Sequence, residues 1–241
     1  MTTDTAAPVK KSDLGVRVAS GIVMILLAVA ALSLGGVVLL AFVLAIMIGV
    51  LWEAWGLVRG IAASPGARLL WMVALTIYAL GAAAGLLNSP SSLRWLAIVS
   101  VIATDTGAYF SGRAIGGPKI APAISPSKTW AGLGGGMVGA ALVMLIFTFT
   151  LAYALSGLDG TPPSLGKIHW SIPATLAVIG IGAFVAILAQ AGDFFESWMK
   201  RRAGVKDSGR LIPGHGGLFD RVDGLLPVAF LLGVLNGGGW L

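Results

Sequence analysis

The sequence predicts an all-α fold, a polytopic integral membrane bundle of about seven transmembrane helices. Of its 241 residues, 57% are apolar and only 11% are charged, and the mean hydropathy is +0.92. Several apolar runs reach about 18 residues, the length at which a helix crosses the roughly 30 Å hydrocarbon core. No run alternates apolar and polar residues as the strands of a membrane barrel do, so helices are expected to satisfy the backbone within the bilayer.

The apolar runs define the elements in order. A polar tail, residues 1–15, precedes a single membrane-embedded domain, 16–241, whose expected helices are 16–34, 37–57, 69–87, 95–110, 130–155, 174–198 and 225–240. Gly35 and Gly36 separate the first two runs as either a tight hairpin or a break in one longer element. A polar loop over 111–129 and another over 156–171 flank the fifth helix. Cysteine is absent, which excludes disulfides and thiolate-bound zinc.

The distribution of positive charge predicts the orientation of the bundle. If the tail faces the cytoplasm and the helices alternate, 14 of the 16 Lys and Arg residues lie on the cytoplasmic side, leaving only Arg94 and Lys167 opposite. Such a split is a strong positive-inside signal. It explains the net charge of +6 without a nucleic-acid partner, and it predicts that the 111–129 and 197–223 segments share the cytoplasmic side.

Acidic residues within the apolar runs are the first candidates for function, because an ionised carboxylate in the membrane costs about 2.5–3.5 kcal/mol unless it meets a cavity, cation or partner. Asp193, Glu196, Ser197 and Lys200 share one helical face by their spacing. Asp220 and Asp223 are three residues apart, so with Asp193 they are able to offer three oxygen ligands to Mg²⁺. The alternative is that these acids form ion pairs at helix ends with nearby arginines, Arg201, Arg210 and Arg221.

Two further acids receive different expectations. Asp105 and Tyr109 lie one turn apart and are expected to line a polar cavity, unless Asp105 instead neutralises Arg113 or caps a broken helix. Glu53 lies between Trp52 and Trp55. It is expected to be a structural residue at an aromatic-rich membrane interface, outside the site.

Two segments are candidates for binding phosphate. Residues 125–130, SPSKTW, end a loop and open a helix, where hydroxyls, Lys128 and free N–H groups form an anion site; the alternative is an ordinary N-cap. Residues 213–217, PGHGG, offer open backbone for phosphate or a flexible turn. No Walker sequence is present. Five glycines that begin the fifth helix are expected to permit close helix packing: Gly132, Gly134, Gly135, Gly136 and Gly139.

The longest motif, residues 197–223, reads S-x-x-K-R-x4-K-D-x-G-x-x-I-P-x-H-G-G-x-x-D-R-x-D. It closely resembles the signature of the phosphatidate cytidylyltransferase family, the CDP-diacylglycerol synthases. DTGAYFSGR at 105–113 and SPSKTWAG at 125–132 resemble two further family motifs, in the family's order. The resemblance therefore covers about half of the chain, 105–224.

The resemblance implies a nucleotidyltransferase that joins CTP and phosphatidate into CDP-diacylglycerol and pyrophosphate for phospholipid biosynthesis. It implies Mg²⁺, with room for a second, monovalent cation, in a bacterial inner membrane with the site facing the cytoplasm. The implied metal ligands and catalytic residues are Asp193, Asp220 and Asp223, with Lys200 also catalytic. The implied substrate contacts are Asp105, Tyr109, Ser125, Lys128, Thr129, Ser197, Lys206, His215 and Arg221.

Other functions remain open on the sequence. A CTP-dependent kinase for a polyprenol or phytol would transfer the γ-phosphate to a lipid alcohol instead. A cation- or proton-coupled transporter would use Asp105 and Asp193 as carriers, but the acids gather toward one side of the membrane and not through its depth. Glycine-rich helices are also compatible with a homodimer.

Overall fold

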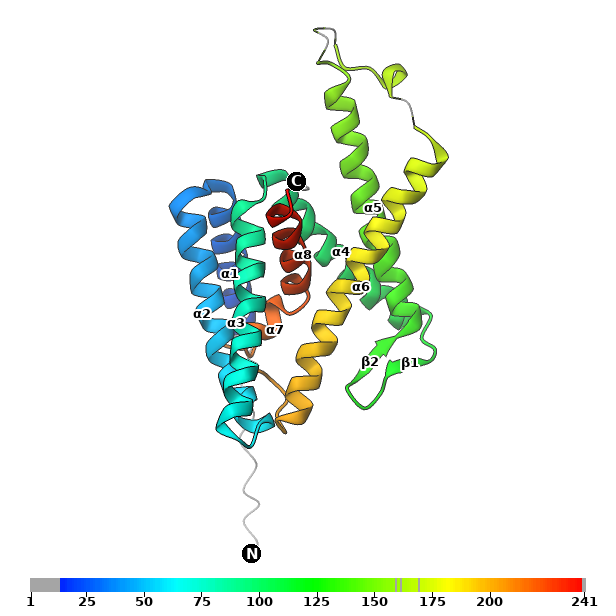
Figure 1. Ribbon diagram of the computed structural model, residues 1–241. Coiled ribbons are helices and arrows are strands. Elements are labelled where there is room, and N and C mark those ends of the chain that lie inside the picture. The colour runs from blue at the N-terminus through cyan, green and yellow to red at the C-terminus, as the bar shows by residue number, and fades with distance from the viewer. Residues whose placement is uncertain (1–13, 159, 161, 169, 240–241) are drawn as a thin grey trace, which may run out of the picture.

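The computed structural model describes residues 14–158, 160, 162–168 and 170–239, and it confirms an all-α bundle (Figure 1). The tail predicted over 1–15 lies outside the described residues except for Leu14 and Gly15. Each of the seven apolar runs forms a helix: α1 Leu14–Leu34, α2 Gly36–Ile61, α3 Pro65–Asn88, α4 Ser91–Ala114, α5 Trp130–Leu155, α6 Ile172–Arg202 and α8 Leu225–Gly237. A short helix, α7 Phe219–Val222, and a 3-10 turn, Leu165–Lys167, complete the helical elements of these residues.

Five of these helices, α1, α2, α3, α5 and α6, are long and apolar enough to cross a membrane. Between α1 and α2, Gly35 and Gly36 have φ values of 64° and 51°, a region that glycine enters freely. The two runs are therefore separate helices joined by a tight turn. Helix α8 has only 13 residues, about 20 Å at 1.5 Å per residue, so it does not match the bilayer by itself.

The polar loop expected over 111–129 contains a feature that the sequence did not predict. Strands β1 Lys119–Ala121 and β2 Ser125–Thr129 pair antiparallel as a hairpin. Thr129 ends the hairpin and caps α5, because its hydroxyl accepts a hydrogen bond from the Gly132 N–H at 3.0 Å. The ordinary N-cap expected as an alternative is thus present at Thr129.

Glycine allows α4 and α5 to pack backbone against backbone. A side chain at Gly135 would collide with Ser111, and one at Gly139 would collide with the Ala103 carbonyl. Gly132 and Gly136 also face α4 at close range, whereas Gly134 faces open space. The predicted packing role is confirmed for four of the five glycines and is wrong for Gly134.

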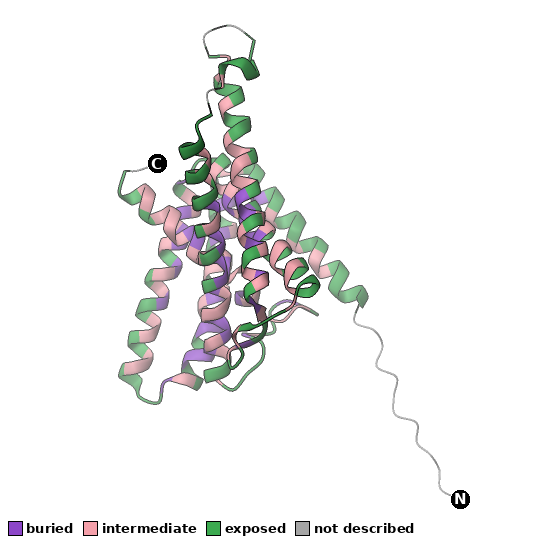
Figure 2. Ribbon diagram, turned by 90° about the vertical axis from the view of Figure 1, so that its right-hand side faces the viewer, coloured by how far each residue is buried: buried purple, intermediate pink, exposed green. Residues whose placement is uncertain are grey.

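The core that supports the site lies between α2, α3, α6 and α7. Leu57, Val58, Met199 and Phe219 are buried there together, and buried positions concentrate along the inner faces of the helices in Figure 2. Helix α7 contacts both α2 and α6. The segment between α6 and α8 therefore folds back into the bundle and carries α7 with it.

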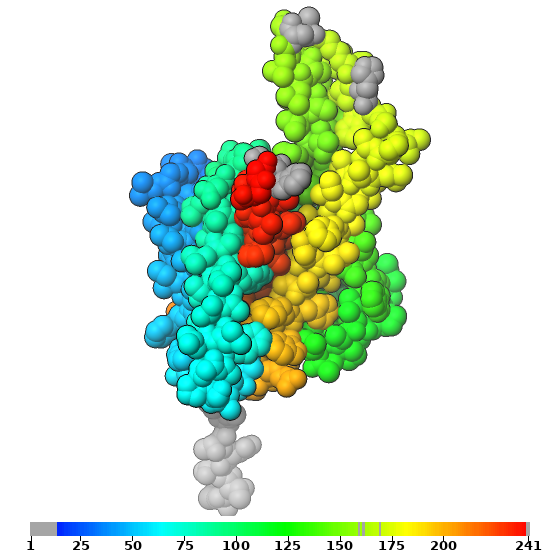
Figure 3. All heavy atoms as spheres, in the orientation of Figure 1, coloured from blue at the N-terminus to red at the C-terminus, as the bar shows by residue number. Residues whose placement is uncertain are grey.

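Polar connections gather at one end of the bundle. Figure 1 places the β hairpin, the α2–α3 turn and the segment after α6 at the lower end, and the 156–171 connection and the end of α8 at the upper end. The upper parts of α5 and α6 project beyond the other helices, as Figure 3 also shows. The hairpin and the 197–223 segment are therefore on the same side, as the sequence predicts.

Candidate active site

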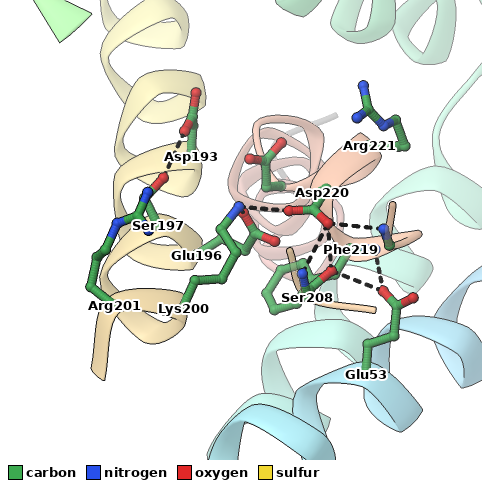
Figure 4. A network of polar contacts seen from close by, with 12 residues as sticks. Glu53, Asp193, Glu196, Ser197, Lys200, Arg201, Ser208, Phe219, Asp220 and Arg221 are labelled. Atoms are coloured by element: carbon green, nitrogen blue, oxygen red, sulfur yellow. Dashed lines mark hydrogen bonds and ion pairs between the residues drawn. The ribbon is translucent and has the colours of Figure 1, made fainter. Parts of the chain in front are cut away.

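Helix α6 presents a polar face near its C-terminal end. The Ser197 hydroxyl donates to Asp193 Oδ1 at 3.3 Å, one turn away. Lys200 follows on the next turn, and Glu196 is completely buried beside it. In Figure 4, Glu196 and Lys200 are directed from α6 toward Asp220 of α7, and Asp193 and Ser197 lie on the adjoining turns of the same helix.

Asp220, in α7, is held by four hydrogen bonds. Its Oδ1 accepts from Lys200 Nζ at 2.6 Å. Its Oδ2 accepts from the Ser208 N–H and hydroxyl, both at 3.0 Å, and from the Gly217 N–H at 2.9 Å. Burial alone would raise the pKa of Asp220, but interactions with Glu196, Lys200 and the Ser208 N–H lower it to about 2. Asp220 is therefore a fixed anion.

Lys200 is shared between two carboxylates. Its ammonium lies 2.5 Å from Glu196 Oε2 and 2.6 Å from Asp220 Oδ1. The Glu196 side chain is 0% exposed and that of Lys200 is 12% exposed, so both charged groups have little contact with water. This arrangement fixes the direction of the ammonium, and neither carboxylate is left without a positive neighbour.

Glu53, in α2, anchors the same loop from the opposite side. Its carboxylate accepts from the Leu218 N–H at 3.0 Å and the Phe219 N–H at 2.8 Å. The Ser208 hydroxyl, 3.1 Å from Glu53 Oε2, shares its single hydrogen between Glu53 and Asp220 (Figure 4). The side chain is buried, at 4% exposure. The structural role predicted for Glu53 is confirmed: between the exposed Trp52 and Trp55, its buried carboxylate holds the loop that leads to Asp220.

Asp193 connects α6 to the β hairpin. Its Oδ2 lies 2.5 Å from Lys128 Nζ, so the 125–132 motif contacts α6 one turn before the 197–223 motif begins. The alternative ion pairs with Arg201, Arg210 and Arg221 do not occur among the described contacts of these acids. Arg201 donates to the Ile124 carbonyl and Arg221 to the His215 carbonyl. Asp193 instead pairs with Lys128, and Asp220 pairs with Lys200.

Asp223 lies beside Asp193 at the end of α7. Gly192 permits this approach, because a side chain there would collide with the Asp223 carbonyl. Asp223 Oδ1 accepts from the Gly224 N–H at 2.8 Å. Burial, and then the negative charge of Asp193, raises the pKa of Asp223 to about 7, with a smaller contribution from Asp105. These carboxylates therefore form a locally negative region that a cation would stabilise.

The predicted aspartates meet the oxygen requirement of Mg²⁺ only in part. Within the described part of the chain, no group of three or more His, Cys, Asp or Glu side chains is placed to hold a metal, so the three predicted aspartates do not share a preformed cage. Asp220 is occupied by its four donors. Asp193 and Asp223 fit a different pattern, since Mg²⁺ is often bound through one or two carboxylates with the remaining oxygens supplied by water and substrate phosphates.

Among the described residues, no hydrogen bond or ion pair joins the other predicted contacts Tyr109, Ser125, Lys206 and His215 to the carboxylates of this cluster. Tyr109 accepts a hydrogen bond from Arg113 at 3.1 Å, and His215 Nδ1 lies 2.9 Å from the Ser20 hydroxyl of α1. Ser125 is buried in β2. Lys206 is exposed on the segment after α6.

An apolar cavity of about 520 Å³ lies between the helices next to this cluster. Its walls come from α1, α2, α3, α4, α7 and α8 and consist almost entirely of aliphatic and other apolar side chains. Asp105 and Arg221 are the only charged residues that line it within the described part of the chain. Asp105 lines this cavity but Tyr109 does not, and the walls are mainly apolar, so the prediction of a polar cavity lined by both residues is wrong. The cavity has the character of a site for a hydrocarbon chain with a charged group at one end.

Fold and site together define a helical membrane protein in which a lysine–carboxylate cluster adjoins an apolar cavity. Residues 82–236 match the Cytidylyltransferase family. A phosphatidate cytidylyltransferase of Rickettsia bellii is 30% identical over 232 residues, covering 95% of this chain and 93% of that protein. The chain belongs to the cytidylyltransferase family.

Shorter alignments reach higher identity. A phosphatidate cytidylyltransferase of Brucella suis is 46% identical over 132 residues, which cover 55% of this chain and 42% of that protein. One of Haemophilus influenzae is 43% identical over 127 residues, covering 53% and 39%. The chain thus spans less than half the length of these two relatives. Glu53 lies before the segment that matches the family.

Proposed function

We propose that this protein transfers the cytidylyl group of CTP to phosphatidate, forming CDP-diacylglycerol and pyrophosphate. The observation that carries the proposal is the apolar cavity placed beside the lysine–carboxylate cluster. A lipid substrate needs room for acyl chains next to a charged reaction centre, and a nucleotide needs a cationic approach from water. The relatives named above are phosphatidate cytidylyltransferases, which supports this choice of substrates.

In the proposed reaction, an oxygen of the phosphatidate phosphate attacks the α-phosphorus of CTP. The new O–P bond forms as the bond from the α-phosphorus to the bridging oxygen breaks, and that oxygen leaves with pyrophosphate. The lipid phosphate is already an anion, so no side chain has to remove a proton. Lys200, Lys206 and Arg221 stabilise the charge that develops on the leaving pyrophosphate. Lys128, Ser125 and Thr129 contact the remaining phosphates from the hairpin.

Asp193 and Asp223 are the residues proposed to hold Mg²⁺, with Asp193 exchanging its Lys128 contact. Asp220 remains a proposed ligand that would likewise have to exchange its Lys200 contact. When bound, Mg²⁺ supplies Lewis-acid stabilisation of the triphosphate. A monovalent cation in the same negative region is part of the proposal. In the geometry described, Asp220 orients Lys200, Ser197 orients Asp193, and the His215 carbonyl orients Arg221.

The lipid is proposed to enter with its acyl chains in the apolar cavity and its phosphate toward Arg221. Tyr109 and His215 are proposed to guide the head group. Asp105, which lines the same cavity, adds to the negative region beside Asp223.

The test uses the full chain in detergent with phosphatidate, Mg²⁺ and CTP labelled at either the α- or the γ-phosphate. Label from the α-phosphate is expected in the lipid together with release of pyrophosphate. Transfer of the γ-phosphate to a polyprenol would establish the kinase instead. Asp220→Asn should abolish turnover while the protein remains in the membrane, and normal CDP-diacylglycerol formation by this variant would exclude the proposed role of Asp220.

The site is proposed to face the cytoplasm of a bacterial inner membrane. Because the chain has no cysteine, single reporters are available. Lys119→Cys, on the hairpin, should react with a membrane-impermeant maleimide only in inside-out vesicles, and Leu158→Cys, in the connection at the opposite end, only in right-side-out vesicles. The reverse pattern would contradict this orientation.

A further inference from the structure

A second pocket of about 470 Å³ lies between the C-terminal part of α2 and the segment after α6. It does not include the proposed metal ligands or the β hairpin. We call it the α2 pocket and define it by its lining residues: Trp52, Glu53, Trp55, Gly56, Arg59, Ser208, Gly209, Arg210 and Leu211. None of its two tryptophans and two arginines is used by the proposed reaction.

The α2 pocket presents positive charge without a competing anion. Arg59 lies over the Trp55 ring at 5.6 Å, and no salt bridge joins Arg59 or Arg210 to another described residue. Both arginines are exposed. The single acid in the wall, Glu53, directs its two oxygens to Ser208, Leu218 and Phe219. The two guanidinium groups are therefore available to a ligand.

The position of the pocket favours a lipid head group as that ligand. Arg59 lies in the last turn of α2, a helix long enough to cross the membrane. Trp52 is 72% exposed and Leu211 is 51% exposed, so an apolar rim adjoins the cations. Tryptophan beside arginine at the end of such a helix is typical of the head-group level. Guanidinium groups bind phosphate through paired N–H donors.

We propose that the α2 pocket binds the phosphate of an anionic phospholipid, at a site separate from the reaction centre. The phosphate contacts Arg59 and Arg210, and the first carbons of the lipid chains pack on Trp52 and Leu211. Ser208 lines this pocket and also donates twice to Asp220. A bound lipid therefore stabilises the segment that carries Asp220, and this effect does not depend on which reaction the protein catalyses.

The test measures binding through the thermal unfolding of the full chain in neutral detergent. Short-chain phosphatidylglycerol is titrated, with short-chain phosphatidylcholine and inorganic phosphate as separate arms. The test variant is Arg59→Gln with Arg210→Gln. The matched control is Arg202→Gln with Lys119→Gln, which removes two charges at the same end of the bundle. Arg202 also lies over a tryptophan, Trp198, at 5.7 Å, but it does not line the pocket.

Phosphatidylglycerol is expected to raise the unfolding temperature of the wild type and the control, and the test variant should bind it roughly tenfold more weakly, about 1.4 kcal/mol. Arg59→Lys with Arg210→Lys should show an intermediate loss, because the charge remains without the paired donors. Unchanged binding by the test variant, or equal loss in the control, would overturn the proposal. An equal response to inorganic phosphate would assign the pocket to a soluble anion and overturn the lipid assignment. Unfolding temperatures without lipid identify any variant that is simply misfolded, and the lysine variant then provides the comparison.

Discussion

Glu53→Gln tests whether α2 holds the reaction loop in place. The substitution keeps the shape of the side chain but replaces one acceptor oxygen with an NH₂ donor. If the NH₂ group takes the Oε2 position, it faces the Phe219 N–H and the Ser208 hydroxyl; if it takes the Oε1 position, it faces the Leu218 N–H. Either orientation leaves one buried backbone N–H without an acceptor, and the bonds that remain lose their charge assistance.

An unsatisfied buried donor costs about 1–3 kcal/mol, and bonds to a charged group contribute more than neutral ones. We therefore expect Glu53→Gln to lose about 2–4 kcal/mol of stability, which lowers the unfolding temperature by roughly 4–16 °C for a chain of this size. Turnover should fall as well, because the loop that positions Asp220 loosens.

Differential scanning fluorimetry in detergent measures this change. The matched control is Gly56→Ala, one turn further along α2, where an added Cβ meets nothing within 4 Å and is expected to have a neutral or slightly stabilising effect. If Glu53→Gln unfolds within about 2 °C of the wild type and keeps its activity, the three hydrogen bonds do not hold the loop and the reasoning fails.

Three further outcomes are expected. Lys200→Met leaves two carboxylates without their shared cation, so the free energy of unfolding should fall by about 3–5 kcal/mol and pyrophosphate release should stop. Thermal unfolding and a pyrophosphate assay measure the two effects, and wild-type values in both would contradict the shared ion pair. Burial and the Asp193 charge raise the pKa of Asp223 to about 7, so protons should compete with Mg²⁺ for this carboxylate. Calorimetry should show the Mg²⁺ affinity falling by up to about tenfold per pH unit below pH 7. An affinity that does not change with pH would exclude Asp223 as a ligand. Gly85→Ala places a Cβ against the Ala229 carbonyl and should cost about 1–3 kcal/mol in the same unfolding assay, unless α3 and α8 are free to separate.

The helices were predictable because length and hydropathy decide which segments enter a bilayer. Each apolar run became a helix, and the Gly35–Gly36 turn followed from two glycines with positive φ. The β hairpin was missed because its short strands contain Pro126 and lack an apolar pattern. The short helix α7 was also missed, because its four residues are too few to show a helical period in the sequence.

The site was predictable only in part, for a physical reason. Spacing along α6 placed Asp193, Ser197 and Lys200 on one face, because helical geometry is local. The partners come from distant segments: Lys128 reaches Asp193 from the hairpin, and Glu53 reaches the loop from α2. A single acid in an apolar run signals that donors are required, but it does not say which backbone N–H groups will supply them.

Asp220 and Asp223 carry the same side chain three residues apart, yet the structure predicts opposite effects of changing them to Asn. The pKa of Asp223 is about 7, against an ordinary value of 3.8. The folded chain thus binds this proton more tightly than the unfolded chain, and stability is lost as pH rises from about 4 through 7. At pH 8 the ionised group costs on the order of 1–4 kcal/mol. In Mg²⁺-free buffer at pH 8, Asp223→Asn should therefore raise the unfolding temperature. In a separate titration, the same variant should fail to bind Mg²⁺.

Asp220→Asn should do the reverse for stability. The pKa of Asp220 lies below its ordinary value, so its ionised form stabilises the fold above about pH 4 and that contribution is lost as pH falls toward 2. The amide loses an acceptor for Lys200 or for the Ser208 and Gly217 donors, and the unfolding temperature should fall. A cation site typically sacrifices stability for function, whereas a fixed anion that orients a lysine does not. If both variants shift stability in the same direction, the division of labour between the two aspartates is wrong.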